Sequence, residues 1–493
     1  MDERVDLKNL PDDPAVLKRT ILQLAQRLED LERQLGVLRR SQFGASSERV
    51  TSPDQLSLFP SRAYPAQIPA PAPKPATRPP SGHGRGALPK ELKRIPKVHD
   101  LPAAEKCCGG CGKELYRIGE ETSEQLEYTP SSLVVIRHER PKYACRTCQD
   151  AVKIAALPAA PIEKGLPGPG LLAHVAVAKF DDHLPLYRQQ EMFRRQGVEV
   201  SRSTMGDWIE AIADLAAPVV SEMARDLLLS KVVHTDDIPV PVLESPHTRE
   251  ARLWVYLGDA SHPHVVYRYS PDRQKVWAQE FLKDFQGFVC ADAYQGYDGL
   301  FVTGQRTEIG CWAHARRKFF DAQAADKERA EAALRLIGAL YQVEEGAKHL
   351  SADERRLRRR ESSLPILKSI KDWMVSQEMD VLPKSALGEA FTYARNQWAA
   401  LNRYVEDGDL PIDNNAAERA LRGIAVGRKN WLFAGSDEGG RRAAVLYSLI
   451  ESAKRVGVNP ETYLKDLLER ISTHPMNRIA ELTPCRWKAA LPT

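Results

Sequence analysis

Residues 231–243 read KVVHTDDIPVPVL, and this stretch decides which fold the chain is expected to adopt. It is followed by ARLWVYLGDA at 251–260 and PHVVYRYS at 263–270. Each stretch favours a strand, because β-branched and aromatic residues are frequent in it and turn residues separate it from the next. The sequence therefore predicts three consecutive strands joined by turns.

The elements that follow complete a mixed α/β domain. We expect a helix at 272–285, a strand at 287–297, and a strand at 307–312 that runs into a further helix. Three strands, a helix, a strand, and then a strand with helices is the order of a ribonuclease-H-like domain, whose mixed sheet carries helices on both faces. The predicted fold class is therefore multidomain α/β with a ribonuclease-H-like catalytic core.

Three acidic residues fall where such a core would bring them together. Asp236 lies at the centre of the first strand, Asp292 at the end of the fourth, and Glu418 on a later helix within DNNAAERALRGIAVGRKNWLFAGS (413–436). Phosphodiester cleavage and strand transfer place extra negative charge on phosphorus, and two Mg²⁺ ions roughly 3.5–4 Å apart stabilise the attacking and leaving oxygens. Mg²⁺ prefers oxygen ligands and keeps some of its waters, so two or three carboxylates suffice. We predict that these acids are catalytic and bind Mg²⁺ or Mn²⁺.

The composition is that of a soluble protein of several domains. The chain has 493 residues, of which 43% are hydrophobic and 28% charged, and its formal net charge is +4. It has no run of 18 apolar residues, so we expect no membrane span. The N-terminal MDERVDLKNL is charged and lacks the apolar segment of a secretory signal. We therefore expect a cytoplasmic, nucleoid-associated protein, in which paired cysteines bind metal more often than they form disulfides.

Residues 1–50 are predicted to form a coiled-coil oligomerisation segment. Apolar residues recur there three and four apart, as at the a and d positions of a heptad: Leu17, Ile21, Leu24, Leu28, Leu31, Leu35 and Leu38. A helix packed on its own domain is the alternative, but a Pro- and Gly-rich basic linker follows at 51–98 instead of a compact domain. We therefore expect a homo-oligomer, with a dimer as its simplest form. The linker either contacts phosphates or is a solvated tether.

Residues 99–160 carry the spacing of a zinc ribbon. Two CxxC pairs, which a predicted strand pair separates, supply four thiols: Cys108, Cys111, Cys145 and Cys148. Two such pairs in a reducing compartment favour a tetrahedral structural Zn²⁺ site. Four buried cysteines without metal are the alternative, and Cys107 could replace Cys108 in the first pair.

The rest of the chain divides at changes of pattern. Residues 161–225 contain two amphipathic helices around QGVEVSRST and resemble a helix-turn-helix, although plain helical bundles share that pattern. The catalytic core is expected at 226–325 and again at 405–457, interrupted by an α-helical insertion at 326–404. Residues 458–493 are expected to form a helical extension.

Four blocks resemble signature sequences of the DDE transposases of the insertion sequence sixty-six family: HTDDIPVPVL, ADAYQGY, GCWAHARRKFF and DNNAAERALRGIAVGRKNWLFAGS. The heptad ending in FGASSER, the lead-in GRGALPKELKRIPKVHDL, the double CxxC and the C-terminal HPMNRIAELTP also fit that family's layout. The resemblance covers nearly the whole chain. It implies a transposase whose catalytic triad falls on Asp236, Asp292 and Glu418, with companion proteins from the same element. The family usually has Glu after the first Asp, whereas this chain has Asp237, which keeps the charge and is expected to support the active site without binding the metal.

The surroundings of Glu418 favour chemistry over a surface ion pair. An exposed pair with Arg422 would contribute only about 0.3–0.5 kcal/mol. Asn414 and Asn415 precede Glu418 and are expected to support the site. Basic and amide groups around a metal-binding carboxylate are groups that DNA phosphates contact. The expected DNA contacts are Arg316, Arg317, Lys318, Arg419, Arg422, Arg428 and Lys429.

The block GCWAHARRKFF contains Cys311 and His314 in CxxH spacing. A zinc ion would need two more ligands, and the sequence offers no second local pair. The resemblance to the CxxH signature of many DDE transposases places His314 beside the active site, where it would position DNA or water. A core histidine is the alternative.

Three functions remain to be distinguished. The first is a transposase that binds the double-stranded ends of its own element, cuts them and joins them to target DNA. The second is a DNA-binding regulator without catalysis, for which the coiled coil, zinc ribbon and helix-turn-helix would suffice. The third is a nuclease without strand transfer. The three acids on separate elements favour catalysis, because a regulator does not need them.

Overall fold

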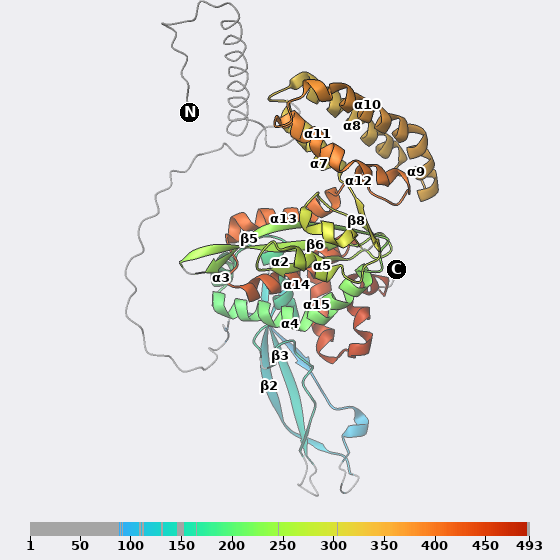
Figure 1. Cartoon of the computed structure of the whole chain (residues 1–493). Helices are drawn as coiled ribbons and strands as arrows, with labels where there is room; N and C mark the ends of the chain where they lie inside the picture. The colour runs from blue at the N-terminus through green and yellow to red at the C-terminus, as the bar shows by residue number, and fades with distance from the viewer. Residues whose placement is uncertain are drawn as a thin grey trace, which may run out of the picture.

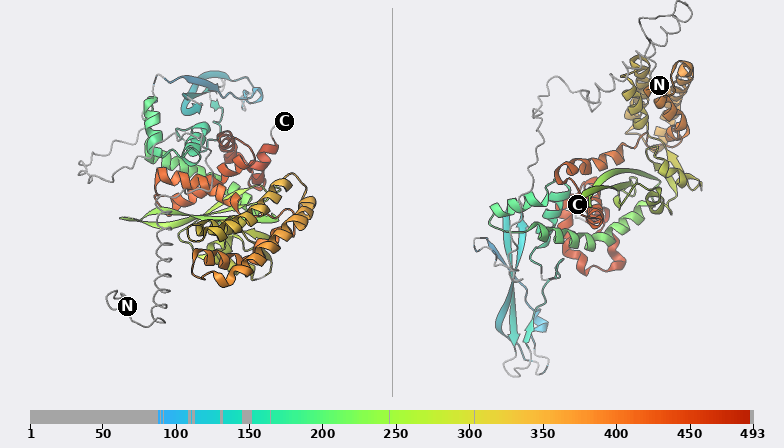
Figure 2. Two further views of the ribbon diagram at one scale, coloured as in Figure 1. Left: turned by 90° about the horizontal axis from the view of Figure 1, so that it is seen from above. Right: turned by 60° about the vertical axis from the view of Figure 1, so that its left-hand side comes forward.

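The computed structural model describes residues 88–490, apart from 89, 91, 108–109, 111–112, 130–131, 145–151, 164, 245 and 303. The heptad and the four predicted zinc ligands Cys108, Cys111, Cys145 and Cys148 lie outside the described residues. The described chain forms a central sheet with helices, a projecting β-hairpin and a helical body. The hairpin and the helical body lie at opposite ends of the molecule (Figure 1, Figure 2).

The central sheet has five strands in the order β7-β6-β5-β8-β9. They are β5 (Val232–Glu244), β6 (His247–Leu257), β7 (Val265–Ser270), β8 (Gly287–Cys290) and β9 (Arg306–Ile309). β5, β6 and β7 are antiparallel neighbours, whereas β8 is parallel to both β5 and β9. The sheet is therefore mixed, as the sequence predicted. β8 is shorter than the expected strand at 287–297, because the chain turns into a 3₁₀ helix at Gln295–Tyr297.

Helices cover the sheet and one of its edges. α13 (Asn415–Trp431) packs against β5 and β6, and α14 (Asp437–Arg455) packs against the edge strand β7. The hydroxyl groups of Ser452 and Ser448 accept hydrogen bonds from the backbone N–H groups of Val265 and Tyr267, each at 2.8 Å. An exposed sheet edge presents unpaired N–H groups, so α14 covers and satisfies this one.

The main hydrophobic core extends well beyond the sheet. It joins apolar residues of α2 (Pro169–Phe180), α4 (Arg202–Leu227), the strands and α15 (Pro460–Arg470) in one cluster. α3 (Leu186–Arg195) contributes Phe193 to the same cluster. The second helix of the expected helix-turn-helix thus begins at Arg202 and buries one side of its length in this core. The helices before the sheet and the segment after it pack on the sheet domain.

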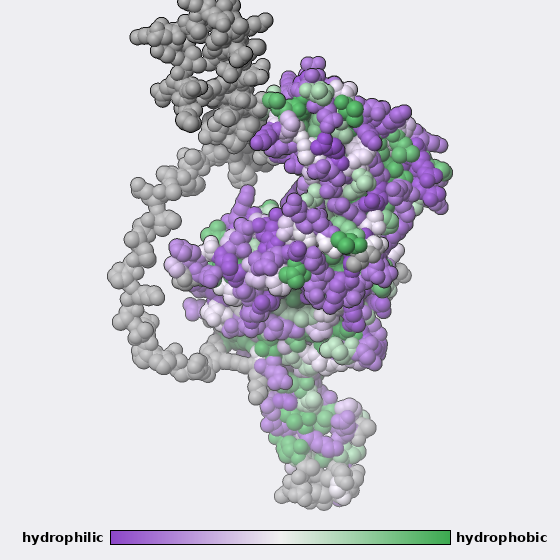
Figure 3. Space-filling view, in the orientation of Figure 1, coloured by the Kyte–Doolittle hydropathy of each residue, from purple (hydrophilic) through white to green (hydrophobic). Residues whose placement is uncertain are grey.

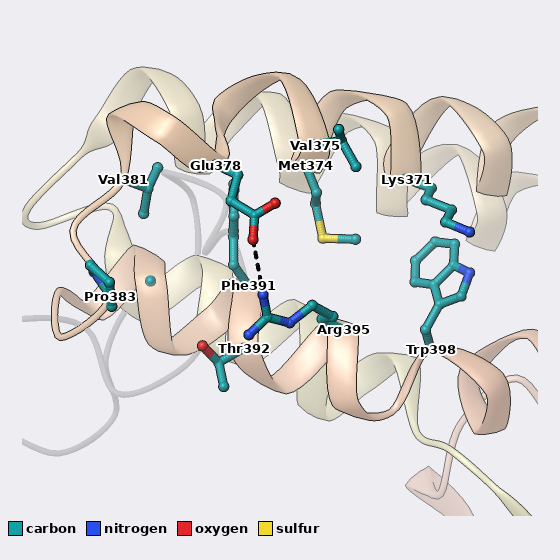
Figure 4. A pocket seen from close by; sticks show the side chains of 11 residues that line it. Lys371, Met374, Val375, Glu378, Val381, Pro383, Phe391, Thr392, Arg395 and Trp398 are labelled. Carbon is teal, nitrogen blue, oxygen red and sulfur yellow. Dashed lines mark hydrogen bonds and ion pairs between the residues drawn. The ribbon is translucent and has the colours of Figure 1, made fainter.

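A second core lies within the helical body. α7 (Trp312–Ala322), α8 (Lys327–Ala347), α10 (Leu364–Gln377) and α11 (Ala386–Asn396) supply most of its residues. α9 (Ala352–Arg358), a π-helical segment at Arg359–Ser363 and α12 (Trp398–Asn402) complete the body. A cavity of about 370 Å³ between α10 and α11 is lined largely by apolar side chains (Figure 4). An ion pair of Glu378 with Arg395 crosses it at 2.9 Å. None of the three acids predicted to be catalytic lines this cavity.

The projecting hairpin consists of β2 (Tyr116–Thr129) and β3 (Ser132–Ala144). β1 (Arg94–Val98) and the short β4 (Val152–Ile154) flank β3 on its other side. Hydrophilic residues cover most of the visible surface of the sheet domain and helical body, whereas apolar residues gather on the hairpin (Figure 3). No helix in the described part of the chain is long and apolar enough to cross a membrane.

Candidate active site

Strand pairing brings Asp236 and Asp292 to the same level of the sheet. β5 and β8 run parallel, and His234 is the register partner of Cys290. Asp236 lies two residues beyond His234, and Asp292 two residues beyond Cys290. The two residues therefore lie near each other where β8 ends, and the charge of Asp292 contributes to the raised pKa of Asp236. This placement depends on the sheet alone, since 56 residues separate the acids in the sequence.

Glu418 reaches the same place from the first turn of α13. Asn414 precedes this helix and is fully buried. Its side-chain amide donates to the carbonyl of Thr235 at 2.8 Å, and its Oδ1 lies 3.0 Å from Nδ1 of His234. Its backbone N–H also donates to Sγ of Cys311 at 3.2 Å. Asn414 thus fastens the start of α13 to β5 and α7, which fixes where Glu418 lies.

A cleft of about 780 Å³ opens beside these acids. Two elements of the sheet domain, β5 and α13, and two helices of the helical body, α7 and α8, form its wall. The lining residues are Asp236, Ala313, His314, Arg316, Arg317, Gly338, Tyr341, Asn415 and Glu418. Asp292 is not among them; its Oδ2 lies 4.0 Å from Nη2 of Arg273.

Burial raises the pKa of both aspartates of the site. Burial raises the pKa of Asp236 to about 7, and the negative charge of Asp292 adds to that rise, with smaller contributions from Asp237 and Glu418. Burial also raises the pKa of Asp292. Two polar atoms here are buried without a hydrogen-bond partner, namely Oδ1 of Asp292 and Nδ1 of His314. A divalent cation would supply the missing positive charge and a contact for Oδ1 of Asp292, so the carboxylates fit Mg²⁺.

Asp237 faces a different environment from its neighbour. Its side chain is 1% exposed and forms ion pairs with Arg252 at 3.1 Å and with Arg273 at 2.8 Å. Successive side chains of a strand point to opposite faces of the sheet. Asp236 accordingly lines the cleft, whereas Asp237 is neutralised by two arginines.

The expected DNA contacts fall into three groups. Arg316 and Arg317 line the cleft, whereas the Lys318 ammonium lies 5.2 Å from the ring centre of Tyr393 in the helical body. Exposed residues of α13 make the second group: Arg419, Arg422 and Lys429. Arg428 stands apart, because it donates a hydrogen bond to the carbonyl of Pro239. Arg317 also pairs with Asp321 at 3.2 Å. The exposed face of α13 and the cleft therefore carry most of the basic groups expected to contact DNA.

Several residues of the site were not found by sequence reasoning. Tyr341 lies in the helical segment and donates to Asp413 at 2.9 Å, and Asn415 donates to the same carboxylate at 2.7 Å. Nothing local in the helical sequence marks Tyr341. Arg252 and Arg273, which hold Asp237, carry no spacing signal either. His234 is the exception that the sequence could have indicated, because strand alternation places its side chain on the same face as Asp236.

Fold and site together define an α/β protein with a carboxylate cluster and a basic cleft. Residues 164–442 match the family model described as Transposase IS66 family. Residues 105–149 match the zinc-finger binding domain of transposase IS66, and residues 448–485 match the IS66 C-terminal element. Residues 30–96 match a model described as Transposase C of IS166 homeodomain. The chain belongs to the IS66 transposase family, which confirms the resemblance seen in its sequence.

Curated relatives of similar length come from Sinorhizobium fredii. The uncharacterized protein y4jD is 32% identical over 499 residues, which cover 96% of this chain and 97% of that protein. The uncharacterized protein y4qI is 34% identical over 494 residues, which cover 94% of this chain and 90% of that protein. The chain is therefore similar to these proteins over nearly its whole length.

Proposed function

We propose that this chain is an active DDE transposase that cleaves the ends of its element and transfers the strands to target DNA in a Mg²⁺-dependent reaction. Asp236, Asp292 and Glu418 are its catalytic acids in this proposal. The observation that carries it is their convergence from a strand, a strand end and a helix, beside a cleft that Arg316 and Arg317 also line. A family of transposases is the expected setting for such a site.

The catalytic core is proposed to be ribonuclease-H-like. Support comes from the strand order β7-β6-β5-β8-β9, with three antiparallel strands followed by two parallel ones. Support also comes from α13, which follows the sheet in the sequence, packs against β5 and carries Glu418. The proposed core consists of 226–325 and 405–457, with the helical insertion 326–404 between them.

Each group of the chain has a proposed role in the reaction. Bound Mg²⁺ supplies the positive charge that stabilises the attacking and leaving oxygens of the phosphodiester. Asp236, Asp292 and Glu418 would hold it, or Mn²⁺ in its place. Arg316 and Arg317 orient the DNA backbone in the cleft, and Arg419 and Arg422 extend the contact along α13. Asn414 fixes Glu418, and Asp413 with Tyr341 supports the helix start.

The N-terminal parts are proposed to organise the DNA complex. Cys108, Cys111, Cys145 and Cys148 would bind one structural Zn²⁺, which the zinc-finger match at 105–149 supports. The heptad would pair two chains so that two element ends are held together. Residues 161–225 would add DNA contacts, and companion proteins of the same element would act with the chain.

The test is strand cleavage by the purified full-length chain with Mg²⁺ and labelled element ends. Nicked ends and products joined to a target duplex are expected, whereas an unrelated duplex of equal length should stay intact. Cleavage without joining would favour the nuclease alternative. Binding without cleavage, in Mg²⁺ and in Mn²⁺, would favour the regulator and contradict the proposal.

A further inference from the structure

A second set of metal-ligating groups lies at the edge of the cleft. Sγ of Cys311, a ring nitrogen of His314 and a carboxylate oxygen of Glu418 lie within 4.8 Å of one another. Cys311 caps the N-terminus of α7, and His314 follows one turn later on the same side. Among the residues that the structure describes, no other group of three His, Cys, Asp or Glu side chains is so close. The sequence showed only the CxxH half, since Glu418 is 104 residues beyond His314.

The contacts within this group leave room for an ion. Nδ1 of His314 is buried without a hydrogen-bond partner. It lies 3.7 Å from Oε1 of Glu418, which is too long for a hydrogen bond. Two ligand atoms held about 2.0–2.1 Å from one tetrahedral metal are about 3.3–3.4 Å apart, so a small closure would let both bind the same ion.

A backbone hydrogen bond fixes the position of the Cys311 sulfur. Cys311 is fully buried, and its sulfur accepts the backbone N–H of Asn414 at 3.2 Å. Hydrogen bonds to a ligand atom orient it and tune the metal that it binds. Glu418 and His314 are partly exposed, so an ion has a path from the cleft.

We propose that Cys311, His314 and Glu418 form a binding site for a zinc-class divalent cation that overlaps the Mg²⁺ site only at Glu418. Sulfur and imidazole ligands select zinc-class ions, whereas Mg²⁺ prefers oxygen. Three protein ligands leave a fourth tetrahedral position open to water. Glu418 belongs to both sites, and a carboxylate drawn to zinc is withdrawn from the ion beside Asp236 and Asp292. Zinc therefore inhibits Mg²⁺-dependent cleavage, a consequence that rests on the proposed function, whereas zinc binding does not.

Equilibrium dialysis of the full chain against Zn²⁺ in excess Mg²⁺, followed by elemental analysis, tests the site. Wild-type protein is expected to hold about one zinc per chain more than Cys311→Ser. His314→Asn, at a partly exposed position, should lose the same zinc if Cys311→Ser proves unstable. Each change should weaken zinc binding by more than about 100-fold, because it removes a ligand. Removing a group that only orients a ligand already weakens metal binding by about 10–100-fold.

Cys485→Ser is the matched control, because it removes a partly buried thiol outside the group. It should keep the additional zinc. Equal zinc in wild type, Cys311→Ser and His314→Asn would overturn the proposal, as would a loss caused by Cys485→Ser alone. Zinc binding of the expected pattern without any Mg²⁺-dependent cleavage would leave this site standing and reject the proposed function.

Discussion

Asp236 and Asp237 are neighbours in β5, yet their side chains meet opposite surroundings. Asp237 is almost fully buried and is neutralised by Arg252 and Arg273. Asp236 faces the cleft, where burial, and after it the negative charge of Asp292, raises its pKa to about 7. The two acids thus differ in charge compensation: arginines pair with Asp237, whereas Asp236 has a cleft and further carboxylates beside it. This difference is why we propose Asp236, and not Asp237, as a ligand of the cation.

Removing the two charges one at a time should have the largest effect. Asp236→Asn keeps the size of the side chain and removes a proposed metal ligand. We expect cleavage of element ends in Mg²⁺ to fall by at least about 1,000-fold, or about 4 kcal/mol of transition-state stabilisation. Asp292→Asn and Glu418→Gln should behave alike. Gel assays of cleavage, with DNA binding measured in parallel, provide the measurement, and all three variants should still bind the ends.

Asp237→Asn is the matched control for that loss. It should retain measurable cleavage, although two arginines lose their carboxylate. We expect the free energy of unfolding to fall by about 2–3 kcal/mol, less than the about 3–5 kcal/mol of a fully buried pair, because Arg273 reaches solvent. If Asp237→Asn were inactive while folded and Asp236→Asn active, the assignment of the two faces would have to be reversed.

Thermal unfolding in Mg²⁺ distinguishes the two aspartates by ion binding, without requiring catalysis. An ion that binds only the native state stabilises it by about 2.7 kcal/mol at about 100 times its Kd. The wild-type Tm should therefore rise on adding Mg²⁺, as should that of Asp237→Asn. Asp236→Asn should show little rise, because the cluster loses a ligand. An equal rise in all three proteins would place the ion elsewhere.

The strands of the sheet could be predicted from the sequence, whereas the hydrogen bonds that hold the site residues in place could not. The strands at 231–243 and 251–260 were found because β-branched and aromatic residues recur in them between turns. Asp292 and Glu418 were proposed from element order and family resemblance, and the structure brings both near Asp236. The hydrogen bonds of Asn414 could not be predicted, because they join elements about 100 and 180 residues away.

The ion pairs of Asp237 could not be predicted from the sequence for a related physical reason. The arginines that neutralise Asp237 lie on β6 and in the loop before α5 (Lys275–Phe281), and only the register of the sheet brings them together. The predicted helix at 272–285 also proved shorter. Asp272 and Arg273 precede the observed helix, and this is what leaves Arg273 able to reach β5.

A smaller loss is expected from Asn414→Ala, which leaves every acid in place. Without its amide, α13 loses its bonds to Thr235 and His234, and Glu418 is held less firmly. We expect cleavage to fall by about 10–100-fold, the usual effect of removing a group that orients a metal ligand. The Mg²⁺ concentration for half-maximal cleavage should rise as well. Asn430→Ala, near the other end of the same helix, should change neither quantity.

The smallest effect concerns the exposed face of α13. Arg422→Gln removes one positive charge beside the cleft and no described ion pair, so element-end binding should weaken by a few-fold, equally for all sequences. Each phosphate contact adds about one unit to the slope of log affinity against log salt concentration, so that slope should fall by about one. Arg478→Gln is the matched control, because this exposed arginine pairs with Glu481 in the C-terminal segment. Binding measured by fluorescence anisotropy over a range of salt would separate the two variants. If both lowered the slope equally, the effect would reflect net charge, and the face of α13 would have no specific contact with DNA.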